Sequence, residues 1–515
     1  MKSTKFISGV SVLLASSIVA KILGAIFRVP LTWVLGIDGL GLYQLIYPVF
    51  ALLIVLSSSG MPTAISKMVA SRIKNNDYIG ARQVLKVSLA FFGSVSLLFS
   101  VGVFFLSEKI ASYQGNELCL LGYRAIAPAI FVVSFLSCLR GYFQGRANMV
   151  PTALSFILEQ GGKLFFGLLL AYLLLPRGVE YATSGALLGV TLSEIVAAGV
   201  LWIIYLKTNK RATNEGTKKP VKAVIGELIV VAFPIVLSSI TLPLLAFVDS
   251  FLVVNLLQND FPVDVSTQMW GVCSGVVTSL VNMPIALTLS VSVSLVPALV
   301  SGGEEERSKL LEKGFDLILL ITLPIMIAFI ILSSEILSTL YGGGFISSGI
   351  SSIATSMLVF CAPLVVLGSW FQTQISSMQS LDRGKAVLIS LLVAGLIKII
   401  LTVILVRVTA LNIWGFVIAN FVFYAVAVAI NSVLLKDVFR LGEFVRGIKC
   451  NVAACLLLAL ILLNIKLLPI YYILKVVLGL ILGGGGYIFA LWVFGFDYKF
   501  LTLFKLPRRE KSEKN

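Results

Sequence analysis

The sequence predicts an all-α integral membrane protein, and three features of the chain indicate this fold class. Of its 515 residues, 58% are hydrophobic and only 12% are charged, and the mean hydropathy is +1.02. A soluble core of ordinary proportions cannot bury so much apolar surface. Apolar windows of about 18 residues or more, long enough to cross a hydrocarbon layer about 30 Å thick, recur along almost the whole chain. The chain also repeats itself at a fixed offset, as chains with two similar membrane lobes do.

The apolar windows predict fourteen membrane-spanning helices. In chain order, they lie near residues 6–27, 40–60, 84–106, 118–140, 152–175, 182–206, 224–247, 268–298, 314–340, 352–378, 386–407, 411–435, 450–468 and 470–494. The first window has Lys2 and Lys5 before it but lacks a small-residue cleavage site. We therefore expect a retained helix there, not a cleaved signal peptide.

Residues that are rare inside apolar helices recur 235 positions apart. The matching sets are Pro62 and Pro297, Ala127-Pro128 and Ala362-Pro363, Gln144 and Gln379, and Lys163 and Lys398. Prolines and lysines are scarce enough in hydrophobic spans for such matches to favour an internal duplication. The repeat therefore predicts two structurally similar halves.

The duplication predicts two parallel, pseudo-symmetric lobes of six helices each, followed by two extra C-terminal helices. An even number of spans per lobe makes both lobes start on the same side of the membrane, so they are related by an axis along the membrane normal. We expect an N-lobe at 1–206, a basic cytoplasmic linker at 207–222, a C-lobe at 223–435, a helix pair at 450–494 and a basic cytoplasmic tail at 495–515.

The net charge of +16 is explained by the placement of Lys and Arg on one side of the membrane. Basic clusters such as 207–222 and 505–514 alternate with loops that hold few cations, so both termini are expected in the cytoplasm. Contact with anionic headgroups of membrane lipids accounts for the basic excess without a nucleic-acid partner.

The chain contains no histidine and six cysteines without a C-x-x-C pair. Histidine is the usual general base and the commonest metal ligand, so its absence argues against an enzyme and against a metal site. The cysteines are expected to be small packing residues. We expect no catalytic residues and no cofactor.

Charged side chains inside the predicted spans are the candidate substrate-binding residues. Each Arg or Lys at the bilayer centre costs about 2.5–3.5 kcal/mol on insertion scales, so each requires a partner or a function. The intramembrane charges are Lys21, Arg124, Lys163, Lys398, Glu159 and Glu194. Glu159 and Lys163 are four residues apart and could form a local ion pair that only neutralises itself. The excess of cations favours the alternative, a net-positive cavity that binds an anionic head group.

Prolines inside several spans predict kinked helices. The repeated prolines Pro62, Pro128, Pro297 and Pro363 are candidate gating positions. Plain helix shape is the competing interpretation, because membrane helices commonly carry proline.

Several stretches of the chain resemble a known family. They are Lys21-Ile22-Leu23-Gly24 with Arg28-Val29, Gly39 to Tyr43, Gly60-Met61-Pro62, Arg124 to Pro128, Arg140 to Gly145, and Asn148 to Ser155 with Glu159-Gln160. Together they resemble the stage V sporulation protein B group of polysaccharide transport proteins. These are relatives of the MurJ-type lipid II flippases in the multidrug/oligosaccharidyl-lipid/polysaccharide (MOP) exporter superfamily.

The resemblance implies a fourteen-helix transporter of the bacterial cytoplasmic membrane, in which the two extra helices form a groove for a lipid tail. It implies that an undecaprenyl-diphosphate-linked sugar, such as lipid II or a related cell-wall or spore-wall precursor, moves from the inner to the outer leaflet by alternating access. Family members place cavity cations at the positions of Lys21, Arg28 and Arg124. Coupling to the membrane potential, Na⁺ or H⁺ and contact with cell-wall synthesis proteins are further expectations.

The cargo stays open, because the helix-eight arginine typical of proteobacterial lipid II flippases is absent from Ser279 to Pro284. A multidrug or cation exporter of the same superfamily is one alternative, although it would favour acidic cavity residues. A non-transporting scaffold of a cell-wall synthesis complex is another. A membrane glycosyltransferase would need acid/base or metal groups on a sizeable loop, and the loops here are short.

Overall fold

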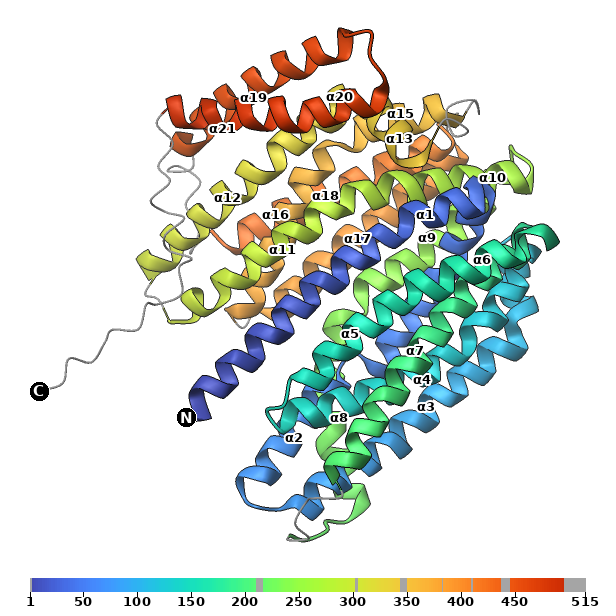
Figure 1. The fold of residues 1–515 in the computed structure, drawn as a ribbon, viewed down its shortest axis with the longest axis vertical. Coiled ribbons are helices and arrows are strands. Elements are labelled where there is room, and N and C mark those ends of the chain that lie inside the picture. Colours follow the sequence, from blue (N-terminus) through green and yellow to red (C-terminus); the bar gives the residue numbers. More distant parts are fainter. Residues whose placement is uncertain are drawn as a thin grey trace, which may run out of the picture. The chain divides into compact units, whose positions relative to one another are not determined.

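The computed structural model describes residues 2–209, 216–301, 304–342, 350–381, 383–408, 411–436 and 445–494. Within these ranges the chain forms helices joined by short turns and contains no strand (Figure 1). It divides into two compact units, Met1–Val276 with Leu401–Phe416, and Val277–Ile400 with Val417–Asn515. The tail at 495–515 and part of the basic linker, 210–215, lie outside the described residues. The two six-helix lobes stay a prediction.

The first unit is built from the N-terminal helices. They are α1 (Lys2–Ser58), α2 (Met61–Lys74), α3 (Tyr78–Tyr113), η1 (Glu117–Cys119), α4 (Leu120–Gly145), α5 (Val150–Gly162), η2 (Lys163–Gly167), α6 (Leu168–Leu174), η3 (Leu175–Arg177), α7 (Val179–Asn209), α8 (Val221–Ser239), α9 (Thr241–Leu257), α10 (Val263–Trp270) and η4 (Gly271–Val277), whose last residue belongs to the second unit. Helix α4 packs against both α3 and α7, and many of its side chains are buried (Figure 1).

Helix α1 joins two of the predicted spans into one element. Its backbone leaves the helical region only at Gly36, with φ 67° and ψ −171°. A positive φ is costly for residues with a Cβ atom and costs glycine little, so this break can persist inside a membrane helix. Residues 6–27 and 40–60 therefore lie on either side of one break in a single helix.

The core of the first unit lies where α2, α3, α4, α7 and α8 meet. Its largest fully buried side chains include Tyr142 and Phe143 of α4 and Leu85 of α3. Tyr142 packs edge-on against Tyr205 of α7, with ring centroids 5.4 Å apart. Aromatic contacts of this kind, together with the apolar area buried, fix α4 against its neighbours. The charged groups described below are attached to this rigid framework.

The second unit contains the remaining helices. They are α11 (Thr278–Ser301), α12 (Glu304–Ile331), α13 (Ser333–Tyr341), α15 (Ile350–Cys361), α16 (Pro363–Ser380), α17 (Gly384–Arg407), α18 (Ile413–Leu434), α19 (Val445–Leu467), α20 (Tyr472–Leu478), η5 (Gly479–Gly483) and α21 (Gly484–Val493). Residues 401–416 at the end of α17 and the start of α18 belong to the first unit.

The C-terminal helices α19 to α21 pack on α12 within the second unit (Figure 1). The Tyr487 hydroxyl donates a hydrogen bond to the Leu320 carbonyl of α12 at 2.9 Å. At the other end of α19, the Lys466 amino group donates to the Ile331 carbonyl at 2.7 Å. These two polar contacts hold α19 and α21 against α12. The rest of this interface consists of apolar side chains.

Twelve helices among the described residues are long and apolar enough to cross a membrane, or thirteen if the bent pair α15–α16 counts as one span. The predicted number of fourteen is therefore not confirmed, because the first two predicted spans share α1. Other predicted spans are also interrupted. Residues 224–247 divide into α8 and α9 at Ile240, and residues 314–340 divide into α12 and α13 at Leu332.

Candidate functional site

Four charged side chains form a buried ionic network in the first unit. Arg140 comes from α4, Glu159 from α5, Lys163 from the start of η2 and Glu194 from α7. The Arg140 Nη2 atom lies 2.8 Å from Glu159 Oε2, and Lys163 Nζ lies 3.0 Å from Glu159 Oε1 and 3.5 Å from Glu194 Oε1. Arg140, Lys163 and Glu194 are 8%, 9% and 2% exposed. Side chains of this kind are almost never so deeply buried unless they are paired.

The sequence brings these charges together through a polar stripe on α5. Ser155, Glu159 and Lys163 are spaced four residues apart, so they lie on one face of the helix. Arg140 binds two members of the stripe, because its Nε atom donates to Ser155 Oγ at 2.8 Å while its Nη2 atom donates to Glu159. The Arg140 guanidinium also lies 4.4 Å from the centre of the Phe156 ring, in cation–π contact.

A π-helical turn at Lys163–Gly167 continues the stripe toward α7. Glycines allow the two helices to approach closely there. A Cβ atom on Gly189 of α7 would lie 2.3 Å from the Gly167 nitrogen, and one on Gly162 would lie 2.7 Å from Ser193 Cβ. Small residues at helix contacts let membrane helices approach in this way. The close approach places Lys163 beside Glu194.

The two carboxylates of the network have unequal surroundings. Glu159 accepts hydrogen bonds from Arg140, Lys163 and Gln160, so both of its oxygens are satisfied. Glu194 has one long contact with Lys163, and its Oε2 atom has no hydrogen-bond partner among the described residues. A buried carboxylate oxygen without a donor is energetically costly. Glu194 is therefore the least stabilised charge of the four.

The other predicted cations lie in different environments. Lys21 and Arg28 are exposed on α1. Arg124 is exposed on α4, where its Nε atom donates to Ser107 Oγ of α3 at 3.2 Å and its guanidinium lies 5.9 Å from the Phe104 ring centre. Lys398 is buried in α17 of the second unit, with its amino group 5.6 Å from the Phe423 ring centre. Only Lys163, Glu159 and Glu194 of the predicted site residues meet in one cluster within a unit.

The four predicted gating prolines occupy two kinds of position, the first turn of a helix and the inside of a helix. Pro62 and Pro363 lie in the first turn of α2 and α16, where the missing amide hydrogen is not needed. Pro128 lies inside the continuous helix α4, and Pro297 lies in α11, with its side chain outside the described ones. Ala362-Pro363 separates α15 from α16 at a bend of 46°, whereas the matching Ala127-Pro128 leaves α4 as one helix. A gating role for these residues stays a prediction.

Arg140 is the member of the network that sequence reasoning missed. It lies at the edge of the predicted span 118–140, so it was not among the predicted intramembrane charges. The polar stripe on α5 held the signal that could have found it. A serine, a glutamate and a lysine on one face of a membrane helix require a partner on the neighbouring helix, and Arg140 is that partner.

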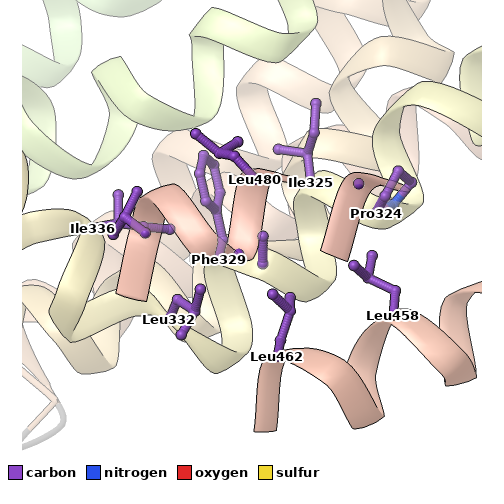
Figure 2. Close-up of a pocket in the computed structure, with 12 residues that line it drawn as sticks. Pro324, Ile325, Phe329, Leu332, Ile336, Leu458, Leu462 and Leu480 are labelled. Carbon is purple, nitrogen blue, oxygen red and sulfur yellow. The ribbon is translucent and has the colours of Figure 1, made fainter. Parts of the chain in front are cut away.

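A second candidate site is an apolar hollow of about 320 Å³ in the second unit. Its wall consists of Pro324, Ile325, Ala328, Phe329, Leu332, Ile336, Leu458, Leu462, Val476, Gly479, Leu480 and Gly484. Figure 2 shows Leu458 and Leu462 of α19 on one side and Pro324 and Phe329 of α12 on another. A space with such a wall suits a hydrocarbon group.

Comparison with solved structures defines the fold of the chain. The chain is similar to a lipid II flippase MurJ in an inward closed conformation, with a TM-score of 0.71 and 16% identity over 95% of this chain and 99% of that chain. It is also similar to an inward-facing MATE-family multidrug resistance transporter of the MOP superfamily, with a TM-score of 0.65 and 20% identity over 81% and 94% of the two chains. The fold is that of MOP-superfamily transporters.

The chain belongs to the polysaccharide biosynthesis protein family, whose profile matches residues 6–302. Two curated relatives come from Bacillus subtilis (strain 168). Stage V sporulation protein B is 29% identical over 429 residues, which cover 81% of each chain, and lipid II flippase MurJ is 25% identical over 463 residues, which cover 84% of this chain and 83% of the relative. The protein is thus a multi-pass membrane transporter and not an enzyme, as the sequence predicted.

Proposed function

We propose that the protein moves an undecaprenyl-diphosphate-linked sugar from the inner to the outer leaflet of the bacterial cytoplasmic membrane by alternating access, with both termini in the cytoplasm. The cargo is a peptidoglycan precursor such as lipid II or a related cell-wall or spore-wall precursor. Relatives named as a lipid II flippase and a sporulation protein, each matched over more than four fifths of this chain, support this proposal.

The observation that carries the proposal is the presence of two contrasting chemistries in one membrane chain. Lys21, Arg28 and Arg124 are exposed cations on membrane helices, and such groups suit a diphosphate. The hollow between α12 and the C-terminal helices α19 to α21 has a wall of apolar side chains and suits part of an isoprenoid chain. An amphiphile with an anionic head and a long hydrocarbon tail requires both chemistries.

Export of a cationic drug is less well supported by the geometry. A cation exporter needs carboxylates that are free to meet its cargo. In the network of the first unit, Glu159 already accepts three hydrogen bonds, and Lys163 lies beside Glu194. The two carboxylates are balanced there by two cations, so this network offers no excess negative charge.

The membrane potential can supply the driving force. A head group with about two negative charges that leaves a negative-inside cell gains about 2.3 kcal/mol per charge per 100 mV. That gain favours export without any chemical step. Flipping in sealed vesicles should therefore speed up when a potential of this sign is imposed, and a rate that ignores the potential would contradict this driving force.

Flipping of a fluorescent undecaprenyl-diphosphate sugar in proteoliposomes tests the proposal. We expect the native chain to flip it, and Lys21→Ala, Arg28→Ala and Arg124→Ala to slow flipping because the diphosphate loses cationic partners. Lys219→Ala is the matched control. Lys219 precedes α8, forms an exposed ion pair with Glu227 and lies outside the candidate site. A folded native chain that does not flip the probe would contradict the proposal.

A further inference from the structure

We propose that Glu194 is a proton-binding carboxyl group whose proton couples the transport cycle to a proton gradient. This inference rests on the proposed transport function for its coupling step. The assignment of the proton to Glu194 does not depend on the identity of the cargo. It follows from three features of the buried network formed by Arg140, Glu159, Lys163 and Glu194.

The first feature is the unequal supply of hydrogen-bond donors. Every oxygen of Glu159 has a donor at 2.8 to 3.0 Å. Glu194 Oε1 is 3.5 Å from Lys163 Nζ, and Glu194 Oε2 lies buried without a donor among the described residues. A proton on Glu194 removes the uncompensated charge and turns the carboxyl into a donor. A proton on Glu159 would instead disrupt the existing hydrogen bonds at one of its oxygens, one at Oε2 or two at Oε1.

The second feature is the charge balance of the network. Arg140 and Lys163 neutralise Glu159 and Glu194 when both carboxylates are ionised. One added proton leaves the network with a net charge of plus one. Three of its four side chains are only 2% to 9% exposed, and Glu159 is half-buried. Charge in such surroundings is poorly screened, so a single proton changes the stability of any state that hydrates the network.

The third feature is a helix turn that can change geometry. The π turn η2 begins at Lys163, and single π turns occur frequently at functional sites. A return of this turn to α geometry would shift Lys163 relative to α7 without unfolding the helix. Lys163 and a proton therefore compete for Glu194, with the proton favoured when the lysine moves away.

All charged or titratable groups that face Glu194 among the described residues belong to this network. They are Glu159 on α5, Lys163 in η2 and Arg140 on α4. Tyr43 and Tyr47 on α1 interact electrostatically with Lys163. The candidate proton sites of the network are its two carboxylates, Glu159 and Glu194. The hydrogen bonds described above decide in favour of Glu194.

Infrared difference spectroscopy of the full-length protein tests the proton site without any transport assay. Glu194→Gln keeps the shape of a protonated carboxyl group and removes its titration. We expect the carbonyl band of a neutral carboxylic acid to be present in the native protein near neutral pH, to be lost in Glu194→Gln and to persist in Glu227→Gln, which changes an exposed carboxylate outside the network. Identical acid bands in native protein and Glu194→Gln from about pH 5 to pH 8 would overturn the assignment.

A flipping assay tests the coupling step. Sealed proteoliposomes carry the fluorescent undecaprenyl-diphosphate sugar and a pH gradient, with the membrane potential clamped to zero. We expect flipping by the native chain to differ between inward and outward gradients, and flipping by Glu194→Gln to be equal in both. Native flipping that ignores the gradient would overturn the coupling. Absence of native flipping would count against the proposed function, and the infrared result would still decide the proton site.

Discussion

Individual charged residues show how the protein tolerates ions inside a membrane. Lys163 and Glu159 form the local pair that their spacing allows, but the pair is also bound by Arg140 and extended to Glu194. Sequence reasoning could predict the pair because four-residue spacing determines which side chains share a helix face. It could not predict the contacts with α4 and α7, because these depend on how helices distant in sequence pack.

Replacement of Arg140 by methionine tests the balance of this network. Arg140→Met should lower the stability of the protein by about 3–5 kcal/mol, because Glu159 then loses one of its two cationic partners and the buried network keeps an uncompensated negative charge. The double variant Arg140→Met/Glu159→Met should recover part of this loss, since Lys163 and Glu194 remain as a neutral pair. Thermal unfolding of the purified variants in one detergent measures both effects. A double variant less stable than Arg140→Met would contradict this account.

Individual helices differ from those that hydropathy predicts where the backbone has a break or a π turn. The apolar windows predicted most helices, since about 18 apolar residues are enough to identify a span. They could not predict that residues 6–58 belong to one helix, because a break at a single glycine leaves hydropathy unchanged. They also could not predict the π turn at Lys163–Gly167, which depends on the contact with α7.

The contact between η2 and α7 can be tested with two glycines of the same helix. Gly189→Ala would place a Cβ atom 2.3 Å from the Gly167 nitrogen, so the two elements must separate. We expect a loss of about 1–3 kcal/mol in stability, as for other overpacked sites. Gly199→Ala is the matched control, because no atom lies within 4 Å of its added Cβ atom. Thermal unfolding would contradict the packing account if both variants matched the native protein.

At the scale of the whole molecule, the sequence predicted the class and the comparisons confirmed it. Composition and hydropathy were enough to predict a multi-pass α-helical membrane protein, and the motifs around Arg124 and Glu159 indicated the family. The described residues contain twelve or thirteen candidate spans, and the number fourteen stays a prediction, because hydropathy does not reveal where a helix continues through a break. The charge pattern predicts the orientation of the termini, which stays a prediction.

Contacts across long stretches of the chain also hold the segment that precedes α8. Asp77, at the start of α3, accepts hydrogen bonds from the Gly80 and Thr217 amides at 2.8 and 3.0 Å and from Arg72 at 2.7 Å. The Lys219 amide donates to Gln83 at 2.9 Å. The described part of the basic linker is thereby bound to the α2–α3 turn.

This linker contact should depend on pH. Burial alone raises the pKa of Asp77, but hydrogen bonds from Gly80, Arg72 and Thr217 outweigh it and lower the pKa below the ordinary value of 3.8. Because the pKa is lowered on folding, Asp77 contributes fully to the stability of the folded protein above the ordinary pKa of 3.8. This contribution is lost as the pH falls through the lower pKa of the folded state. Hydrogen exchange, corrected for its intrinsic pH dependence, should show Gly80 and Thr217 amides protected at pH 6 and unprotected in Asp77→Ala. Equal protection in both proteins would contradict this contact.

The apolar hollow beside α12 also has a consequence for the isolated protein. A space of about 320 Å³ without polar side chains in its wall offers water no hydrogen bonds, so it favours apolar occupants over water. Dry apolar spaces of this kind take up xenon or benzene. Crystals pressurised with xenon should therefore show a strong noble-gas peak between Phe329 and Leu462, which would mark the hollow independently of any substrate.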